Sequence, residues 1–343
     1  MPPPVRAALV GFGYAGRTFH APLIAACPAM SLEAVVSRQV EAVVNAWPDA
    51  RVLASFDDVL ADPAIDLIVL ATPNDLHAGQ AEAALKAGKA VVVDKPFTLT
   101  VAEARHLAAL AEMRGLLLSV FHNRRWDADF LTLQTLIAED RLGPVVRFES
   151  SFNRWRPEVR DRWREGDGPG AGIWYDLGPH LIDQALVLFG RPLGVTCDLA
   201  ILRPGGRATD YVHAVMRYAD KRVILHADMT TPAPDARFAV HGARASWLKI
   251  GLDVQEDQLK LCLTPGASGW GVDSRPGVVI DGATGAQDAV AGPLGDYPAY
   301  YADVARAIQG GAPNPVPPGE AVAVMEVLEA GLLSAERRAE VAL

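Results

Sequence analysis

The chain has 343 residues, which is too long for one ordinary hydrophobic core, so we expect two domains. Half of its residues are hydrophobic and 21% are charged, as in folded globular proteins rather than disordered ones. The formal net charge of −9 argues against nucleic acids and anionic membrane surfaces as ligands, because both favour a basic excess. Small molecules are therefore the expected partners.

The three cysteines, Cys27, Cys197 and Cys262, are odd in number and far apart in the sequence. This spacing suggests neither a disulfide framework nor a Cys-x-x-Cys metal site, and it fits a reducing cytoplasm. No apolar leader precedes the first predicted strand at Val5, and no later apolar run reaches membrane-spanning length. We expect neither export nor membrane anchoring, and no bound metal.

From residue 5 to about 120, short β-branched runs alternate with alanine-rich helical patterns. The predicted helices lie near residues 15–26, 75–87 and 101–114, and Thr100 with Glu103 forms a capping box before the last one. This alternation is typical of a doubly wound parallel sheet, the Rossmann class of α/β fold. The predicted strands are VRAALV, LEAVVS, DLIVLA, AVVVD and LLLSVF.

After Asn123 the pattern changes to that of a second α/β domain with a mainly antiparallel sheet. We expect a helix at 127–138, a strand at PVVRFESSF, an irregular stretch at 153–172 and a helix at 173–190. The glycine-rich stretch 266–295 is predicted to leave the sheet, and helices near 297–308 and 320–338 follow it. The boundary between the domains is placed between residues 122 and 123. The remaining predicted strands are GVTCDLAIL, YVHAVMRY, RVILHADM, RFAVHG and SWLKIG.

The first turn after a predicted strand fits the G-x-G-x-x-G spacing. By itself this spacing is a weak signal, but here it follows a strand and opens a helix, as dinucleotide binding requires. The glycines let the backbone approach a pyrophosphate, and the helix N-terminus offers free N–H groups. The motif consists of Gly11, Phe12, Gly13, Tyr14, Ala15 and Gly16.

The tip of the second predicted strand selects between the two nicotinamide dinucleotides. NAD enzymes usually carry an acid there for the ribose 2′-hydroxyl, whereas this chain has Ser37 and Arg38. A hydroxyl beside a guanidinium suits a 2′-phosphate, so NADP is favoured, with NAD possible but less favoured. The alternative is that Arg38 is only a solvated arginine at a strand end.

Two further strand ends carry polar residues, in ATPN at 71–74 and VDKP at 93–96. Open α/β sheets bind ligands at the carboxyl ends of their strands. An ammonium held between apolar β-structure and a proline, as Lys95 is, suits a group that contacts a reacting hydroxyl. The alternative is a surface lysine paired with Asp94.

A third constellation lies on the helix predicted at 173–190. Asp176, His180 and Asp183 have the i, i+4, i+7 spacing that places them on one helix face. A lone helical histidine is more often structural, but a neighbouring carboxylate can orient an imidazole for proton transfer. A metal site is poorly supported, because no third group of ligands is apparent in the sequence.

Five arginines and two tryptophans alternate in the irregular stretch FNRWRPEVRDRWREGDG. The acids Glu158, Asp161, Glu165 and Asp167 largely cancel the positive charge. We therefore expect a loop over a pocket and not a nucleic-acid surface. The arginines are Arg154, Arg156, Arg160, Arg162 and Arg164, and the tryptophans are Trp155 and Trp163.

Taken in order, GFGYAG, ATPND, VVDKPF, FHNRRWD and GAGIWYDLGPHLID resemble the Gfo/Idh/MocA family of glucose-fructose oxidoreductase and inositol dehydrogenase. The resemblance covers essentially the whole chain, and within the family it is greatest to NADP-dependent scyllo-inositol dehydrogenases. It implies an N-terminal Rossmann domain for NADP and a C-terminal α/β domain whose open sheet builds a homodimer or homotetramer.

The resemblance also implies roles for individual residues. Lys95 would be the catalytic lysine, although Asp94 stands where the family usually has Glu, and Asp176 with His180 would position the substrate and move the proton. The remaining cofactor-binding residues would be Thr72, Pro73, Asn74, His77, Asp94, His122, Asn123, Trp163 and Arg164. The substrate would contact Lys95, Asp176 and His180 together with Arg124, Trp126, Asn153 and Tyr297.

These observations predict a dehydrogenase that transfers a hydride between NADP and a secondary hydroxyl of a cyclic polyol or sugar. Two alternatives remain at this point. One is a glycosidase that uses tightly held NAD for transient oxidation, and the other is a non-catalytic NADP-dependent regulator. The presence of both Lys95 and His180 argues against the regulator.

Overall fold

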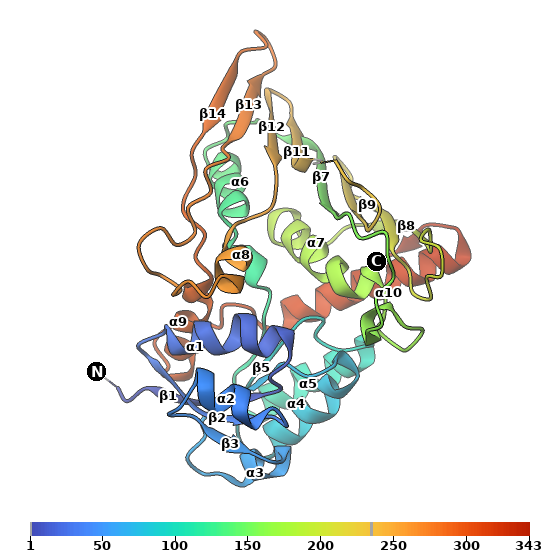
Figure 1. Cartoon of the computed structure of the whole chain (residues 1–343). Coiled ribbons are helices and arrows are strands. Elements are labelled where there is room, and N and C mark those ends of the chain that lie inside the picture. Colours follow the sequence, from blue (N-terminus) through green and yellow to red (C-terminus); the bar gives the residue numbers. More distant parts are fainter. Residues whose placement is uncertain (1, 234–235) are drawn as a thin grey trace. The chain divides into compact units, whose positions relative to one another are not determined.

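The computed structural model describes residues 2–233 and 236–343 (Figure 1). Backbone contacts divide the chain into two compact units, and each unit combines separate segments of the sequence. Unit 1 contains the chain up to Trp126, Val254–Gly271 and Asp296–Val322. Unit 2 contains Asp127–Asp253, Val272–Gly295 and Ala323–Leu343.

Unit 1 is built on a six-stranded parallel sheet of order β3-β2-β1-β4-β5-β6. This is the strand order of dinucleotide-binding folds, and the chain reverses its direction of growth between β1 and β4. The predicted Rossmann architecture is therefore confirmed. Its strands are β1 (Val5–Val10), β2 (Met30–Val36), β3 (Arg51–Leu53), β4 (Leu67–Leu70), β5 (Ala90–Val93) and β6 (Leu118–Val120).

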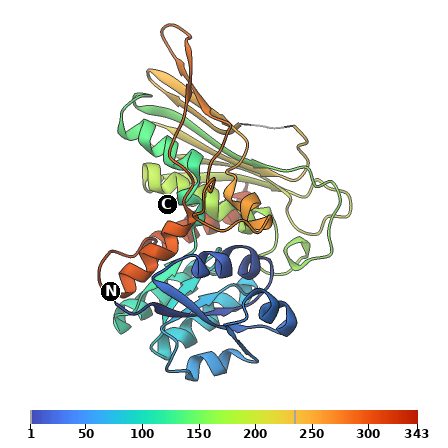
Figure 2. The same ribbon diagram turned by 60° about the vertical axis from the view of Figure 1, so that its left-hand side comes forward.

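Helices flank both faces of this sheet (Figure 2). The capping box predicted before α5 is present, since Thr100 Oγ1 accepts from Glu103 N at 3.2 Å and Glu103 Oε2 accepts from Thr100 N at 3.0 Å. The first predicted helix begins as a π-helical turn at Gly16–His20. The α-helices are α1 (Ala21–Ala25), α2 (Val40–Ala46), α3 (Phe56–Ala61), α4 (His77–Lys86), α5 (Val101–Arg114), α8 (Gln255–Lys260) and α9 (Tyr297–Ile308).

Unit 2 contains a nine-stranded sheet of order β14-β13-β12-β11-β7-β10-β9-β8-β15 among the residues that the structure describes. All neighbouring pairs are antiparallel except β7 and β10, so the predicted mainly antiparallel sheet is confirmed. Its strands are β7 (Val145–Asn153), β8 (Gly194–Ala200), β9 (Tyr211–Arg217), β10 (Arg222–Asp228), β11 (Ala236–Gly242), β12 (Ala245–Ile250), β13 (Gly277–Asp281), β14 (Gln287–Val290) and β15 (Val341–Ala342).

The expectation that residues 266–295 leave the sheet is wrong for residues 277–290. There β13 and β14 form a hairpin, and β13 pairs with β12 through four consecutive residue pairs. The turn between the two strands is built around Asp281, whose Oδ1 accepts hydrogen bonds from the backbone N atoms of Ala283 and Thr284. The polar, exposed β14 hides the alternation that identifies a strand in sequence.

One face of the nine-stranded sheet is covered by α6 (Ala128–Ala138) and α7 (Ile173–Phe189), as Figures 1 and 2 show. The indole of Trp174 on α7 is buried and donates a 3.0 Å hydrogen bond to Leu328 O of α10 (Pro318–Arg337). The opposite face is only partly buried and carries Val215, Ile224 and Leu248 beside charged residues. This second face is an open sheet surface.

Candidate functional site

The carboxyl ends of β1, β2 and β4 border a hollow of about 580 Å³ in unit 1. It lies at the edge where parallel sheets bind ligands, next to the reversal of strand order. Its walls combine the glycine-rich turn with the ends of the neighbouring strands. The lining residues are Val10, Gly11, Phe12, Val36, Ser37, Arg38, Gln39, Ala54, Ser55, Phe56, Thr72 and Gln80.

The glycine-rich turn fits a nucleotide pyrophosphate. Gly11 has φ +99°, and a Cβ there would lie 2.7 Å from Ala71 O; a Cβ on Gly16 would lie 2.1 Å from Gly11 O. These two glycines are required by the packing of the turn itself. A Cβ on Gly13, in contrast, would meet no atom within 4 Å, so this position leaves the backbone open to a ligand. Such a turn before a helix is the cradle that a pyrophosphate needs.

The end of β2 presents Ser37, Arg38 and Gln39 to the same hollow. Ser37 Oγ accepts a 2.9 Å hydrogen bond from Gln39 N, and Gln39 Nε2 donates to Phe12 O at 3.2 Å, so the strand end is tied to the glycine-rich turn. No carboxylate is present among the residues that line the hollow. The acid that would accept from a ribose 2′-hydroxyl is therefore missing from its walls.

Lys95 follows β5 and is fixed through its backbone. Lys95 N donates a 2.8 Å hydrogen bond to Asp94 Oδ1, and the same oxygen lies 3.7 Å from His20 Nε2. His20 is buried, and its Nδ1 lies 2.6 Å from the hydroxyl of Tyr301. Burial by itself raises the pKa of the Asp94 carboxyl, but the hydrogen bonding and charge of His20, with Lys95 and His77, lower it below its usual range. Asp94 is thus an ionised anchor for the turn that carries Lys95.

His77, at the start of α4, joins the turns after β4 and β5. Its ring nitrogens lie 3.0 Å from Thr72 O and 2.8 Å from Pro96 O. Burial lowers the pKa of His77, and the nearby Asp94 opposes this only in part, so the ring is neutral at pH 7 and one nitrogen donates. His77 thus links the turns that follow two neighbouring strands. Its contact with the cofactor remains a prediction.

A buried network surrounds Arg124, which the resemblance assigns to substrate binding. Its Nη2 lies 2.7 Å from Glu256 Oε2, and its Nη1 donates to the hydroxyl of Tyr297 at 3.4 Å. Glu256 on α8 also accepts a 2.9 Å hydrogen bond from the hydroxyl of Tyr14 in the glycine-rich turn. His122 and Asn123 are also buried, and Asn123 begins the short helical turn that ends at Trp126.

Glu256 was not predicted from the sequence. It lies more than 130 residues after Arg124, in a six-residue helix. The fold brings this helix beside the glycine-rich turn, although its sequence shows no apolar periodicity that would indicate such packing. Its neighbour Gln255 fixes the arrangement, because its amide bonds to Trp126 O at 3.0 Å and to Tyr297 N at 2.7 Å.

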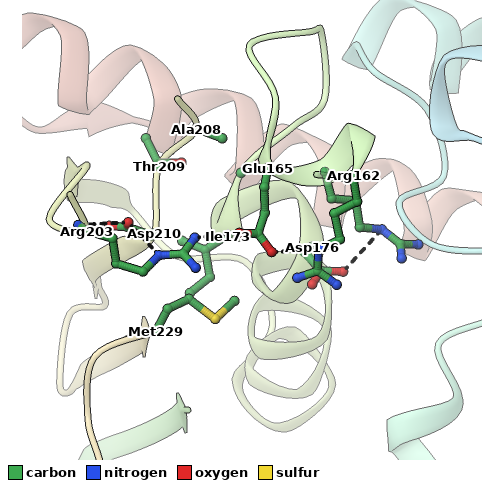
Figure 3. A pocket seen from close by; sticks show the side chains of 11 residues that line it. Arg162, Glu165, Ile173, Asp176, Arg203, Ala208, Thr209, Asp210 and Met229 are labelled. Carbon is green, nitrogen blue, oxygen red and sulfur yellow. Dashed lines mark hydrogen bonds and ion pairs between the residues drawn. The ribbon is translucent and has the colours of Figure 1, made fainter. Parts of the chain in front are cut away.

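In unit 2, α7 carries Asp176, His180 and Asp183 on successive turns, as predicted. His180 and Asp183 are buried, and the ring of Phe152 lies 6.3 Å from that of His180. Asp176 is half-buried and lies 3.7 Å from Arg164 Nε, and it borders a small pocket with Arg162 and Glu165 (Figure 3). Asn153 ends β7, the strand that also contains Phe152.

Trp163 and Arg164 lie in a short turn between β7 and α7. The Arg164 guanidinium stacks over the Trp163 indole at 4.8 Å, and 42% of the Trp163 side chain is exposed. A large exposed aromatic that is held in place by a cation suits contact with a flat ligand. The described residues contain no cluster of three or more His, Cys, Asp or Glu that could hold a metal. They also contain no helix of the length and apolarity that a membrane crossing needs.

Comparison with protein families identifies both halves of the chain. Residues 5–122 match the Gfo/Idh/MocA model described as an oxidoreductase family NAD-binding Rossmann fold, and residues 134–343 match its C-terminal alpha/beta domain. The protein therefore belongs to the Gfo/Idh/MocA oxidoreductase family, and unit 1 contains its NAD(P)-binding Rossmann fold. The predicted family is confirmed.

Individual relatives match over almost their full lengths. An uncharacterized oxidoreductase of Escherichia coli, YdgJ, is 53% identical over 99% of both chains. The scyllo-inositol 2-dehydrogenase (NADP(+)) IolW of Bacillus subtilis is 36% identical over 99% of this chain and 96% of its own. The solved structure of the YPO2259 putative oxidoreductase from Yersinia pestis superposes with a TM-score of 0.96 at 49% identity, covering 100% of this chain and 98% of that one.

The open space at Gly13 yields a direct test of the nucleotide cradle. Gly13→Val should change the free energy of unfolding little, because a Cβ at this position meets no atom within 4 Å. It should weaken NADPH binding about 10- to 100-fold, because the side chain holds the pyrophosphate away from the backbone N–H groups. Fluorescence titration with NADPH and thermal unfolding measure the two effects. Gly79→Val in α4, also in open space, is the control, and equal affinities of the two variants would contradict the assignment.

Proposed function

We propose that this protein is an NADP-dependent dehydrogenase or reductase that acts on a secondary hydroxyl of a cyclic polyol or sugar of the scyllo-inositol kind. The observation that carries the cofactor choice is the hollow lined by Ser37 and Arg38 without a carboxylate. The names of the relatives support the substrate class. They include the NADP-dependent scyllo-inositol 2-dehydrogenase and, at 30% identity over 71% of this chain, an inositol 2-dehydrogenase of Rhizobium meliloti.

The chemistry divides among three side chains of this chain. NADP, when bound, accepts or supplies a hydride at the nicotinamide ring. We assign His180 as the base that takes the hydroxyl proton during oxidation and returns it during reduction. The ammonium of Lys95, whose backbone N–H is held by Asp94, stabilises the developing alkoxide, and the carboxylate of Asp176 orients substrate and base.

The remaining assignments complete this proposal. Residues 1–122 bind NADP with help from Trp163 and Arg164, and residues 123–343 bind substrate and self-associate. Arg124, Trp126, Asn153 and Tyr297 are proposed to contact the substrate. The cytoplasm is the proposed location, which fits an exposed free thiol at Cys262.

The preference for NADPH should fall when the guanidinium at the end of β2 is removed. Arg38→Ala should weaken NADPH binding by about 1.5 to 3 kcal/mol, as loss of a charge-assisted contact to the 2′-phosphate predicts, and should leave NADH binding nearly unchanged. Titration of both nucleotides checks this. Arg51→Ala, at an exposed arginine outside the hollow, should change neither affinity. The assignment fails if wild-type protein uses NADH as efficiently as NADPH.

Removing either catalytic group should abolish turnover without abolishing cofactor binding. Lys95→Ala and His180→Ala should each lower kcat by about 10²- to 10⁴-fold, the usual effect of losing a positioned base or an oxyanion-stabilising cation. Asp176→Asn should shift the pH profile of kcat. The measurement is kcat against pH on the best polyol of a screen, with His106→Ala on exposed α5 as control. A His180→Ala enzyme with full turnover and the wild-type profile would show that His180 is structural.

The open face of the nine-stranded sheet supports self-association. Its partly buried apolar residues, among them Ile224 and Leu248, have no covering helix in unit 2. We expect light scattering to show a dimer or tetramer at micromolar concentration, and Ile224→Glu to shift it toward the monomer. A monomeric wild-type protein would contradict this and leave the catalytic proposal intact.

A further inference from the structure

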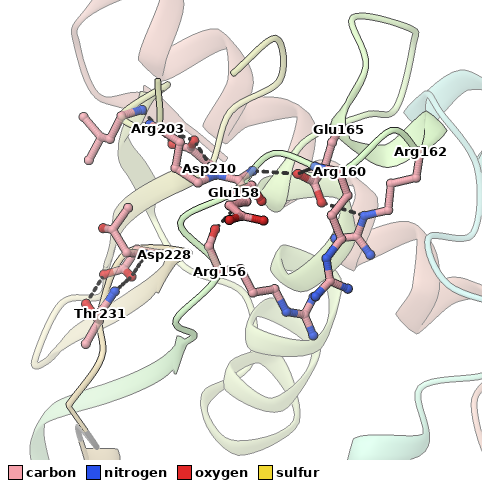
Figure 4. Close-up of polar contacts among 11 residues, drawn as sticks. Arg156, Glu158, Arg160, Arg162, Glu165, Arg203, Asp210, Asp228 and Thr231 are labelled. Atoms are coloured by element: carbon pink, nitrogen blue, oxygen red, sulfur yellow. Dashed lines mark hydrogen bonds and ion pairs between the residues drawn. The ribbon is translucent and has the colours of Figure 1, made fainter. Parts of the chain in front are cut away.

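Four arginines of the segment between β7 and α7 form a charged group, and the proposed function uses only one of them, Arg164, which it assigns to the cofactor. We call Arg156, Arg160, Arg162 and Arg164 the arginine cluster. Figure 4 shows the side chains of Arg156, Arg160 and Arg162 extending from this segment beside one another. The sequence predicts that neighbouring acids cancel their charge, so the actual partners of those acids decide whether the cluster is neutral.

The nearby buried acids both form ion pairs with Arg203, an arginine outside the cluster. Glu165 is buried and lies 2.6 Å from Arg162 Nε and 3.0 Å from Arg203 Nη2. Arg203 also pairs with the buried Asp210 at 2.9 Å, so Glu165 is shared with this outside arginine and Asp210 pairs with it alone. Glu158 is exposed, and neither it nor the exposed Asp161 forms an ion pair within the described ranges. The cancellation predicted from the sequence is therefore incomplete.

Arg156 is the least compensated member of the cluster. Its side chain is partly buried and has no ion-pair partner among the residues described. Burial lowers the pKa of this guanidinium, and the positive charges of Arg154, Arg162 and Arg160 lower it further. The carboxylate that opposes this effect is Asp176. A partly buried cation among other cations is unfavourable unless an anion joins it.

The position of the cluster connects it to the proposed reaction. Asp176, the proposed orienting carboxylate, lies 3.7 Å from Arg164 Nε and lines one small pocket with Arg162 and Arg164 (Figure 3). An anion bound by the cluster would therefore lie beside the start of α7, where the proposed catalytic pair begins. Within the cluster, Glu165 pairs with Arg162 and Asp176 lies near Arg164, whereas Arg156 and Arg160 have no ion pair among the described residues.

We propose that the arginine cluster binds an oxyanion carried by the substrate, so that the enzyme prefers sugars or polyols bearing a carboxylate or a phosphate ester. This inference rests on the proposed function and narrows its substrate class. Guanidinium groups suit the task, because their planar N–H pairs match the geometry of carboxylate and phosphate oxygens. The competing explanation is that the cluster has a structural role and only stabilises the negative charge of the Asp176 carboxylate.

The experiment compares matched compounds in the NADPH-linked assay of the full-length enzyme. Each set contains a neutral sugar or polyol, its carboxylate and its phosphate ester, such as galactose, galacturonate and galactose 6-phosphate. We expect one acidic member to exceed its neutral counterpart at least about tenfold in kcat/KM, and which one does so distinguishes carboxylate from phosphate. Raising the ionic strength should increase KM for the acidic member alone.

Substitution at Arg156 separates anion binding from a structural role. R156Q should lower kcat/KM about 10- to 100-fold for the acidic member and leave that of the neutral member within about threefold. R156K, which keeps the charge but loses the planar donor pair, should be intermediate, and R114Q at the exposed end of α5 is the control. Equal losses on neutral and acidic members, or a neutral member preferred by wild type, would overturn the inference.

A binding measurement keeps this test separate from the proposed reaction. If no compound is turned over, the proposed function fails, but calorimetric binding of galacturonate or galactose 6-phosphate that R156Q abolishes would still support the anion site. If turnover of neutral polyols is found and neither acid binds, the proposed function stands and the inference is wrong. Thermal unfolding of R156Q verifies that the variant is folded.

Discussion

The approach of backbone to backbone at the first turn of unit 1 is the constraint on which the cofactor site depends. β1 pairs with β2 on one side and β4 on the other, and the turn after β1 must pass between their carboxyl ends. Gly11 and Gly16 permit this passage, because a Cβ on either would collide with a carbonyl oxygen. Once the turn is fixed, its residues Gly11 and Phe12 and the end of β2 border one hollow.

The same edge of the sheet also fixes the proposed catalytic lysine. His77 contacts carbonyl oxygens of the turns after β4 and β5, and Asp94 binds the backbone of Lys95 while a buried histidine lies near its carboxylate. Asp94 is shorter than the Glu that the resemblance implies at this position, and it acts on the main chain of the lysine. The turn that carries the lysine is thereby fixed at the carboxyl end of β5.

Sequence patterns predicted the parts of the fold that depend on local chemistry. The capping box at Thr100, the period of α7 and the apolar runs of β1, β4 and β5 each follow from short-range spacing, and each is present. The short elements β3, α2 and α3 and the polar strand β14 carry too few periodic residues to be recognised. Glu256 and the distribution of acids around the arginine cluster depend on contacts between distant segments, which spacing along the chain does not encode.

The central claim is that a hydride passes between NADP and a polyol carbon. Each turnover then leaves one of the two oxidised and the other reduced. The most direct measurement incubates the protein with NADPH deuterated at the transferable C4 position and a cyclic ketose such as scyllo-inosose, and analyses the alcohol product by mass spectrometry. The account predicts a product that gains one deuterium at the new alcohol carbon, in equal amount to the NADP formed. Product without deuterium, or conversion of a glycoside without net formation of NADP, would contradict it.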